Sequence, residues 1–185
     1  TVTAEALAAV YRYERPDELR RDLDALGAAD LILLDEHGTA QATETGHRLL
    51  AEMYAIDAEI AASLWRGQMP FLPGLNDAAG RLVTAALATG GPAYLTMAPP
   101  HEPADATVGL LLHHRLSVLR YHRADAHAAA WQDAGLTSQA IQQLAAGPTR
   151  DAVEARTNGL AGTPYSTLAP DERLNFLAGL AALPG

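Results

Sequence analysis

Apolar residues recur at helical spacing in two short stretches near the start of the sequence. The first follows Thr3, a good N-cap residue, and predicts a helix over residues 4–11. The second begins at Pro16, because the fixed φ of proline suits the first position of a helix, and it ends at Gly27. The pattern therefore predicts two helices joined by a short linker.

The periodicity then changes from helical to extended. Residues 31–35 and 39–43 flank a turn at 36–38 and predict a small β-hairpin. After Thr43, which is placed to cap a helix, apolar residues return to helical spacing and continue to about Trp65. The predicted order is helix, helix, hairpin and long helix.

Prolines and glycines are concentrated between residues 67 and 80 and separate this unit from the remainder. We therefore expect two domains, 1–67 and 68–185. The stretch 90–105 is expected to be a loop. The second domain is expected to be an antiparallel helical bundle, because capped helical stretches follow one another along it. Its expected helices cover 76–89, 106–134, 137–146, 149–160 and a segment that starts at Pro170. Gly135 is expected to end the helix over 106–134, and Thr137 is expected to cap the next helix.

The helix expected over 106–134 is apolar around much of its circumference. One narrow stripe is a core seam, and Leu110 and Ala128 lie on the opposite side. We therefore expect this helix to be central and largely buried. The seam consists of Val108, Leu112, Leu119, Ala126 and Ala130.

The composition is that of a globular protein with a sizeable core, since 49% of the 185 residues are hydrophobic and the mean hydropathy is -0.02. The absence of cysteine excludes disulfides and thiolate chemistry. Apolar runs are far shorter than the roughly 20 residues of a membrane helix, so no membrane association and a cytoplasmic location are expected. The net charge of -9 disfavours nonspecific binding to nucleic acid.

The order helix, helix, hairpin, long helix in the first 65 residues resembles the MarR-like winged-helix regulators, as does the Thr43-x-x-Gly46 turn. The resemblance implies a mainly α fold with a small β-wing: a winged helix followed by the helical bundle. It also implies that the helix from Pro16 recognises DNA and that the helix after Thr43 mediates dimerisation. The family's first helix has no counterpart before Thr3, so an upstream segment, another helix or a second subunit is expected in its place.

The resemblance implies double-stranded DNA as a partner. Arg15, Arg20 and Arg21 would contact phosphates or guanines, and His37 at the wing tip could approach the minor groove. A homodimer is expected, because one recognition helix buries too little surface for specificity. The net charge of this segment disfavours DNA binding, since residues 1–66 hold six arginines and thirteen acidic residues.

The polar residues of the long helix form two ladders on a helix that is expected to be buried. They could pair with one another and with facing helices, line a pocket for a small anionic or aromatic ligand, or hold a metal. His122, three residues before Asp125, is expected to hydrogen-bond to that carboxylate. One ladder contains His113, Arg120, His127 and Trp131, and the other contains His114, Tyr121 and Asp125.

Residues 119–131 also resemble, weakly, a helix of actinobacterial DinB-like helical proteins, some of which carry winged helices. That family binds a divalent metal through three histidines, often with a His-x-x-x-His pair. No histidine of this helix has another four residues later, which argues against metal-dependent transferase chemistry. We assign no metal ligands, no catalytic residues and no cofactor. His47 and His101 could contribute from outside the helix.

The leading functional hypothesis is a ligand-responsive DNA-binding transcriptional regulator, with a small-molecule effector bound around the histidine-rich helix. The alternative is a DinB-like helical enzyme or resistance protein whose winged helix is structural or dimerising. In that case His113, His127 or the pair His122 and Asp125 would act as acid and base. A third possibility is a protein-interaction module that binds a basic partner. Winged helices serve all three roles, so fold alone does not decide among them.

Overall fold

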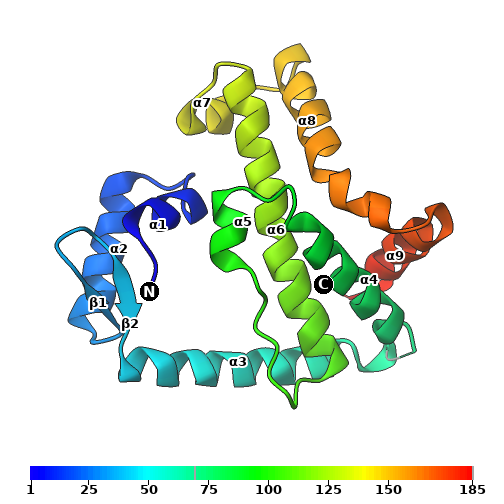
Figure 1. The fold of residues 1–185 in the computed structure, drawn as a ribbon, viewed down its shortest axis with the longest axis horizontal. Coiled ribbons are helices and arrows are strands. Elements are labelled where there is room, and N and C mark those ends of the chain that lie inside the picture. The colour runs from blue at the N-terminus through cyan, green and yellow to red at the C-terminus, as the bar shows by residue number, and fades with distance from the viewer. Residues whose placement is uncertain (69, 185) are drawn as a thin grey trace.

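The structure is a computed structural model that describes residues 1–68 and 70–184. It is mainly helical with one two-stranded antiparallel sheet, which confirms the expected fold class at that level (Figure 1). The first elements are α1 (Ala4–Val10), α2 (Pro16–Ala28), β1 (Ile32–Leu34), β2 (Ala40–Ala42), α3 (Glu44–Leu64) and the 3₁₀ helix η1 (Arg66–Gln68). They are followed by α4 (Leu72–Ala86), α5 (Pro92–Met97), α6 (Val108–Asp133), α7 (Ser138–Gln143), α8 (Pro148–Ala161), the 3₁₀ helix η2 (Thr163–Thr167) and α9 (Pro170–Ala182).

The hairpin β1–β2 has a third short partner. Its strands pair antiparallel with Leu34 opposite Ala40. Val2 forms an isolated bridge to Ala40, and the two residues exchange both backbone hydrogen bonds at 2.8 Å. Residues ahead of α1 are thereby tied to the hairpin, so α1, α2 and the sheet form one N-terminal unit.

The Thr43-x-x-Gly46 turn has a clear physical role at the start of α3. The Thr43 hydroxyl accepts a hydrogen bond from the Gly46 amide at 3.0 Å and donates one to the Asp30 carbonyl at 2.5 Å. A Cβ added at Gly46 would overlap the carbonyl oxygen of Leu31. Glycine therefore allows the first turn of α3 to lie directly against the chain that enters β1.

The expected caps around the longest helix are also confirmed. The Thr137 hydroxyl accepts from the Ala140 amide at 3.1 Å at the start of α7. Gly135 follows α6 with φ of 72°, a left-handed conformation that glycine adopts at helix ends without steric cost. Local sequence chemistry thus sets the ends of these helices.

Helix α6 is central, as expected. It contacts α3, α4, α5, α7 and α8, and Figure 1 shows the N-terminal unit and α5 on one side of it and α4, α8 and α9 on the other. Helix α6 has 26 residues, and the buried ones include three polar residues, His114, His122 and Asp125. Within the described residues, no helix combines the length and apolarity that crossing a membrane requires.

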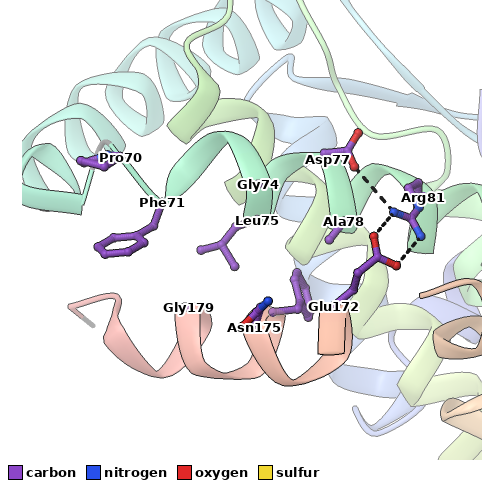
Figure 2. A pocket seen from close by; sticks show the side chains of 11 residues that line it. Pro70, Phe71, Gly74, Leu75, Asp77, Ala78, Arg81, Glu172, Asn175 and Gly179 are labelled. Atoms are coloured by element: carbon purple, nitrogen blue, oxygen red, sulfur yellow. Dashed lines mark hydrogen bonds and ion pairs between the residues drawn. The ribbon is translucent and has the colours of Figure 1, made fainter. Parts of the chain in front are cut away.

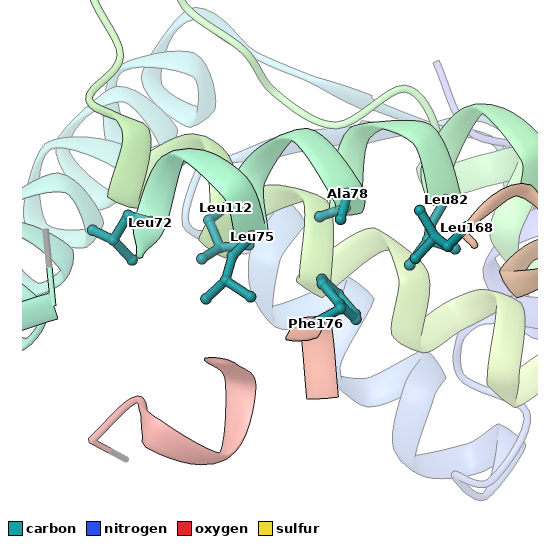
Figure 3. Close-up of a cluster of buried hydrophobic side chains, with 8 residues drawn as sticks. Leu72, Leu75, Ala78, Leu82, Leu112, Leu168 and Phe176 are labelled. Atoms are coloured by element: carbon teal, nitrogen blue, oxygen red, sulfur yellow. The ribbon is translucent and has the colours of Figure 1, made fainter. Parts of the chain in front are cut away.

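The largest apolar cluster lies between α4, α6 and α9 (Figure 3). Leu75 and Leu82 of α4 face Phe176 of α9, and Leu112 of α6 completes the contact; all four side chains are almost fully buried. A residue larger than glycine at Gly179 would collide with Leu75, so α9 lies close against α4. This packing fixes α9 against α4, and α4 also contacts α5, since the Tyr94 hydroxyl donates to the Val83 carbonyl at 2.5 Å.

Two expectations for this half of the chain are wrong, the start of one helix and the absence of another. Helix α4 begins at Leu72 rather than residue 76, because Pro73 occupies the first turn, where a missing amide costs nothing. Helix α5 lies within the stretch that was expected to be a loop. Its N-terminal amides, at Ala93 and Tyr94, donate to the Asp125 carboxylate of α6, a tertiary cap that the local sequence does not reveal. Met69 of the expected 67–80 linker lies outside the described residues.

Candidate functional site

Arg12, in the linker between α1 and α2, forms an ion pair with Asp125 of α6. The side chains are 13% and 7% exposed, so the pair is largely shielded from water. Arg12 also donates to the Ala9 carbonyl at 2.7 Å, while Asp125 accepts from the Tyr94 amide at 2.8 Å and the Ala93 amide at 3.3 Å. Arg12 and Asp125, here called the docking pair, thus join the N-terminal unit, α5 and α6.

The next linker residue, Tyr13, makes a second contact with α6. Its hydroxyl oxygen accepts from Trp131 Nε1 at 3.3 Å, which leaves the hydroxyl proton to be donated to His127 Nδ1, 2.8 Å away. The Tyr13 carbonyl accepts from Gln142 of α7 at 3.1 Å. Burial lowers the pKa of His127, although nearby Glu154 acts in the opposite direction. The neutral imidazole that this lowered pKa favours is the form that can accept from Tyr13.

A cavity of about 330 Å³ lies beside the docking pair. Arg12, His122 and Asp125 all contribute to its wall, together with Thr89 of the segment after α4 and Gln132 of α6. We call it the docking cavity. Burial lowers the pKa of His122, although the Asp125 carboxylate raises it. The cavity therefore presents one cation, one carboxylate and an imidazole whose neutral form is favoured.

The prediction of a hydrogen bond between His122 and Asp125 is wrong. His122 Nε2 lies 2.9 Å from the Thr89 hydroxyl, and Asp125 is engaged by Arg12 and the α5 amides. The helix periodicity had placed the two residues on neighbouring positions, but each side chain finds a closer partner on another element. The acid–base pair considered for an enzyme is therefore not assembled in this structure.

The histidines at the start of α6 belong to a different cluster. His114 donates from Nδ1 to the His101 carbonyl at 2.6 Å, and the His101 ring stacks on Tyr54 of α3 with ring centroids 4.0 Å apart. His114 Nε2 is buried with no hydrogen-bond partner among the described residues, 3.9 Å from Asp57. His113 is half-buried with its ring beside that of His114. This cluster joins α3 to α6.

The two predicted ladders therefore do not line one pocket. Eleven residues separate His114 from Asp125, about 16 Å along a helix. Arg120 is exposed, with its guanidinium 4.8 Å from the centre of the Tyr121 ring and 2.8 Å from the Tyr121 hydroxyl. Among the predicted ligand residues, His122 and Asp125 line the docking cavity, while Trp131 and His127 contact Tyr13.

The residues predicted to contact DNA are all at the surface. Arg15, Arg20 and Arg21 lie on or just before α2 with side chains about 70% exposed. Acidic residues of the same helix are close to each of them: Arg15 pairs with Asp17 and Arg20 pairs with Asp24, both at 2.9 Å. Arg21 lies 3.9 Å from Glu18. These arginines are available to phosphate, but each must give up or share a carboxylate.

The hairpin turn presents His37 to solvent. Its side chain is 79% exposed and lies 3.6 Å from the carboxylate of Glu36. Asp35 stabilises the turn, since one of its carboxylate oxygens accepts from the amides of His37 at 2.9 Å and Thr39 at 2.8 Å. These hydrogen bonds lower the pKa of Asp35. The turn is well defined, and His37 projects from it.

One face of α3 is apolar and exposed. Its large side chains recur every three or four residues, which places them on a single stripe of the helix. Each is between 40% and 55% exposed. We call this the α3 stripe, and it consists of Leu49, Met53, Ile56, Ile60 and Leu64.

Sequence reasoning missed a groove of about 410 Å³ between α4 and α9. Figure 2 shows Phe71 at one end of it and the ion pair of Arg81 with Glu172 at the other. Arg81 donates to both carboxylate oxygens of Glu172, and the Ala169 amide donates to one of them. These contacts lower the pKa of Glu172 to about 2. Sequence reasoning gave no reason to pair these two residues, because Arg81 and Glu172 lie in distant segments of the chain.

Among the residues that the structure describes, no group of three or more histidine and acidic side chains is arranged to hold a metal ion. Comparison of the chain with family models, with curated proteins and with solved structures found no match. The function must therefore be argued from the geometry of the chain itself.

Proposed function

We propose that this chain is a ligand-responsive DNA-binding regulator, in which the N-terminal unit contacts double-stranded DNA and residues 68–185 bind a small-molecule effector. One observation carries the proposal: the docking pair that holds the N-terminal unit on α6 also forms part of the wall of a cavity. A molecule in that cavity would contact the residues that position the N-terminal unit. Ligand binding and DNA binding would thereby be coupled.

The proposed winged-helix arrangement is supported by the order of α1, α2, the hairpin and α3, and by the bridge between Val2 and Ala40. In that arrangement α2 enters the major groove with exposed Arg15, Arg20 and Arg21, and His37 at the hairpin turn reaches the adjacent minor groove. The neighbouring carboxylates weaken this binding, because DNA phosphates must displace them from the arginines. Added salt weakens it further, because binding releases counterions from the DNA.

The docking cavity favours an effector that carries an anionic group. Such a group could pair with Arg12 in place of Asp125. Asp125 would keep the hydrogen bonds from the Ala93 and Tyr94 amides, so its charge would not be left without partners. The exchange would remove one of the two attachments of the N-terminal linker to α6 and would weaken its docking, while the contacts of Tyr13 with His127 and Trp131 would remain.

A homodimer through the α3 stripe fits the proposed DNA-binding mode. Burying five exposed apolar side chains against a second copy would remove a patch that monomers rarely leave in water. The 21 residues of α3 span about 31 Å, close to the roughly 34 Å between successive major-groove half-sites. An antiparallel pairing of two α3 helices would place the two N-terminal units at opposite ends of that span.

DNA binding is tested by fluorescence anisotropy with a labelled random-sequence duplex at about 50 and 200 mM salt. We expect affinity to fall steeply with salt, and the double variant Arg20→Ala/Arg21→Ala to reduce the slope of log K against log salt by about 2. The matched control, Arg156→Ala/Arg173→Ala, removes the same charge from α8 and α9 and should leave the slope unchanged. Absence of binding at low salt, or an equal effect of the two double variants, would contradict the proposal.

A further inference from the structure

A second hollow, distinct from the docking cavity, lies between α3 and the segment that leads into α6. It has a volume of about 590 Å³. Its α3 wall is made by small side chains at helical spacing, Ala51, Ala55 and Ala58, with Tyr54 beside them. We call it the α3 cleft. It lies on a different face of α3 from the α3 stripe, so a second copy on that stripe would not fill it.

Aromatic groups form the next part of the lining. The rings of Tyr54 and His101 stack nearly parallel, 4.0 Å apart with an interplanar angle of 13°, and both residues line the cleft. The His114 ring makes an edge-type contact with the Tyr54 ring, with centroids 5.3 Å apart. Because Tyr54 is fixed from two sides, the cleft offers a rigid aromatic edge beside a flat wall of alanines. Such a surface suits a planar ring system.

The charge of the cleft selects the sign of its ligand. Asp105 is the one acidic residue among the described residues that line it, and no arginine lines it. Asp57 lies just outside, 3.9 Å from the unpartnered Nε2 of His114. A cation in the cleft is therefore attracted by the Asp105 carboxylate, whereas no arginine among the described lining residues would pair with an anion.

We propose that the α3 cleft binds a planar aromatic cation of two or three fused rings. The rings would lie on Ala51, Ala55 and Ala58, and the positive group would face Asp105. Since the occupied cleft would join α3 to the start of α6, the ligand would stiffen the junction between the long helix and the bundle. This site does not depend on the docking cavity or on DNA binding, and its test uses no DNA.

The probe is proflavine, a tricyclic cation, titrated into the full chain and followed by its fluorescence. Anthracene-9-carboxylate, a tricyclic anion, is the control ligand. We expect saturable binding of proflavine with one site per chain, and at least tenfold weaker binding of the anion. Asp105→Asn should weaken proflavine binding about tenfold, and Ala55→Phe should abolish it by filling the cleft. Glu59→Gln, which removes a charge from α3 outside the cleft, should change the affinity less than twofold.

Thermal melts establish that each variant folds, and the exposed position of Asp105 makes its variant a mild change. The proposal is overturned if proflavine does not bind, if the anion binds as tightly as the cation, or if Asp105→Asn and Glu59→Gln weaken proflavine binding equally. The last result would mean that the dye senses only the net negative charge. None of these outcomes would bear on the DNA titration, so the two proposals fail independently.

Discussion

The hydroxyl of Tyr13 lies 2.8 Å from Nδ1 of His127, although the two residues are more than a hundred positions apart in the chain. Tyr13 follows Arg12 directly, and the two side chains reach different positions on α6. A linker of the N-terminal unit is thus fixed at two points on the central helix. Polar residues of α6 that looked like a ligand-binding set serve in part as this attachment.

Replacing Tyr13 with phenylalanine should reduce stability by about 1–2 kcal/mol, because the buried Trp131 Nε1 loses its acceptor and His127 loses its donor. Chemical denaturation at pH 7.5 measures the change. Tyr11→Phe is the matched control, since Tyr11 is 42% exposed, and it should change stability by less than about 0.5 kcal/mol. Equal effects of the two variants would show that the Tyr13 hydroxyl contributes nothing to docking.

Gly46→Ala should destabilise the chain by about 3 kcal/mol or more, because the new methyl group would overlap the Leu31 carbonyl oxygen and push α3 away from β1. Gly159→Ala is the contrasting variant. It lies within α8 with open space around it, so alanine should stabilise the chain by about 0.5–1 kcal/mol. Thermal melts of the two variants should shift in opposite directions. A harmless Gly46→Ala would mean that α3 does not contact the hairpin in this way.

The chain should lose stability as the pH falls below about 7, in part through His122. Burial lowers the folded-state pKa of His122 below its ordinary value of 6.5, so the unfolded chain binds the proton more readily. The destabilisation begins as the pH falls through 6.5 and levels off below the folded-state pKa. His122→Asn keeps a polar partner for Thr89 but cannot titrate.

Urea denaturation at pH 7.5 and pH 5.5 measures this effect. The loss of stability between the two pH values should be smaller in His122→Asn than in the parent chain. His37→Asn, at the exposed hairpin turn, should leave the loss as it is in the parent. The interpretation of His122 fails if its variant and the His37 variant show the same pH dependence.

Ile56→Glu should convert a dimer into a monomer, because it places a charge at the centre of the α3 stripe. Sedimentation velocity of the parent and the variant measures the change in mass. Leu174→Glu makes the same substitution at an even more exposed apolar residue of α9, and it should leave the dimer intact. A monomeric parent chain, or a dimer broken only by Leu174→Glu, would exclude the α3 stripe as the interface.

Much of the fold follows from local sequence chemistry. Thr43 and Thr137 cap their helices as expected, and the change of periodicity after Gly27 marks the hairpin. Helix α5 could not be predicted in this way, because the group that stabilises its N-terminus is Asp125, some thirty residues further along the chain. Periodicity identifies which residues share a face, but it does not identify the partner that a side chain meets across an interface.

The candidate site, like the fold, was predicted where it depends on residues of one helix and missed where it depends on contacts between distant segments. The sequence singled out α6 and its polar residues, and His122 and Asp125 do line a cavity. It gave no reason to select Arg12 or Tyr13, since a linker arginine and tyrosine are common and their partners lie on a distant helix. His101 was noted only as a residue that could contribute, and its contact with Tyr54 depends on how α3 crosses the start of α6.

The most direct test of the account is a double-mutant cycle on the docking pair. Arg12→Ala and Asp125→Ala should each cost about 3 kcal/mol in chemical denaturation, because each leaves a buried charge without its partner. The double variant should cost less than the sum of the two, with a coupling energy of at least about 1.5 kcal/mol. Additive single effects would contradict the account, because they would show that Arg12 does not hold the N-terminal unit on α6 through Asp125.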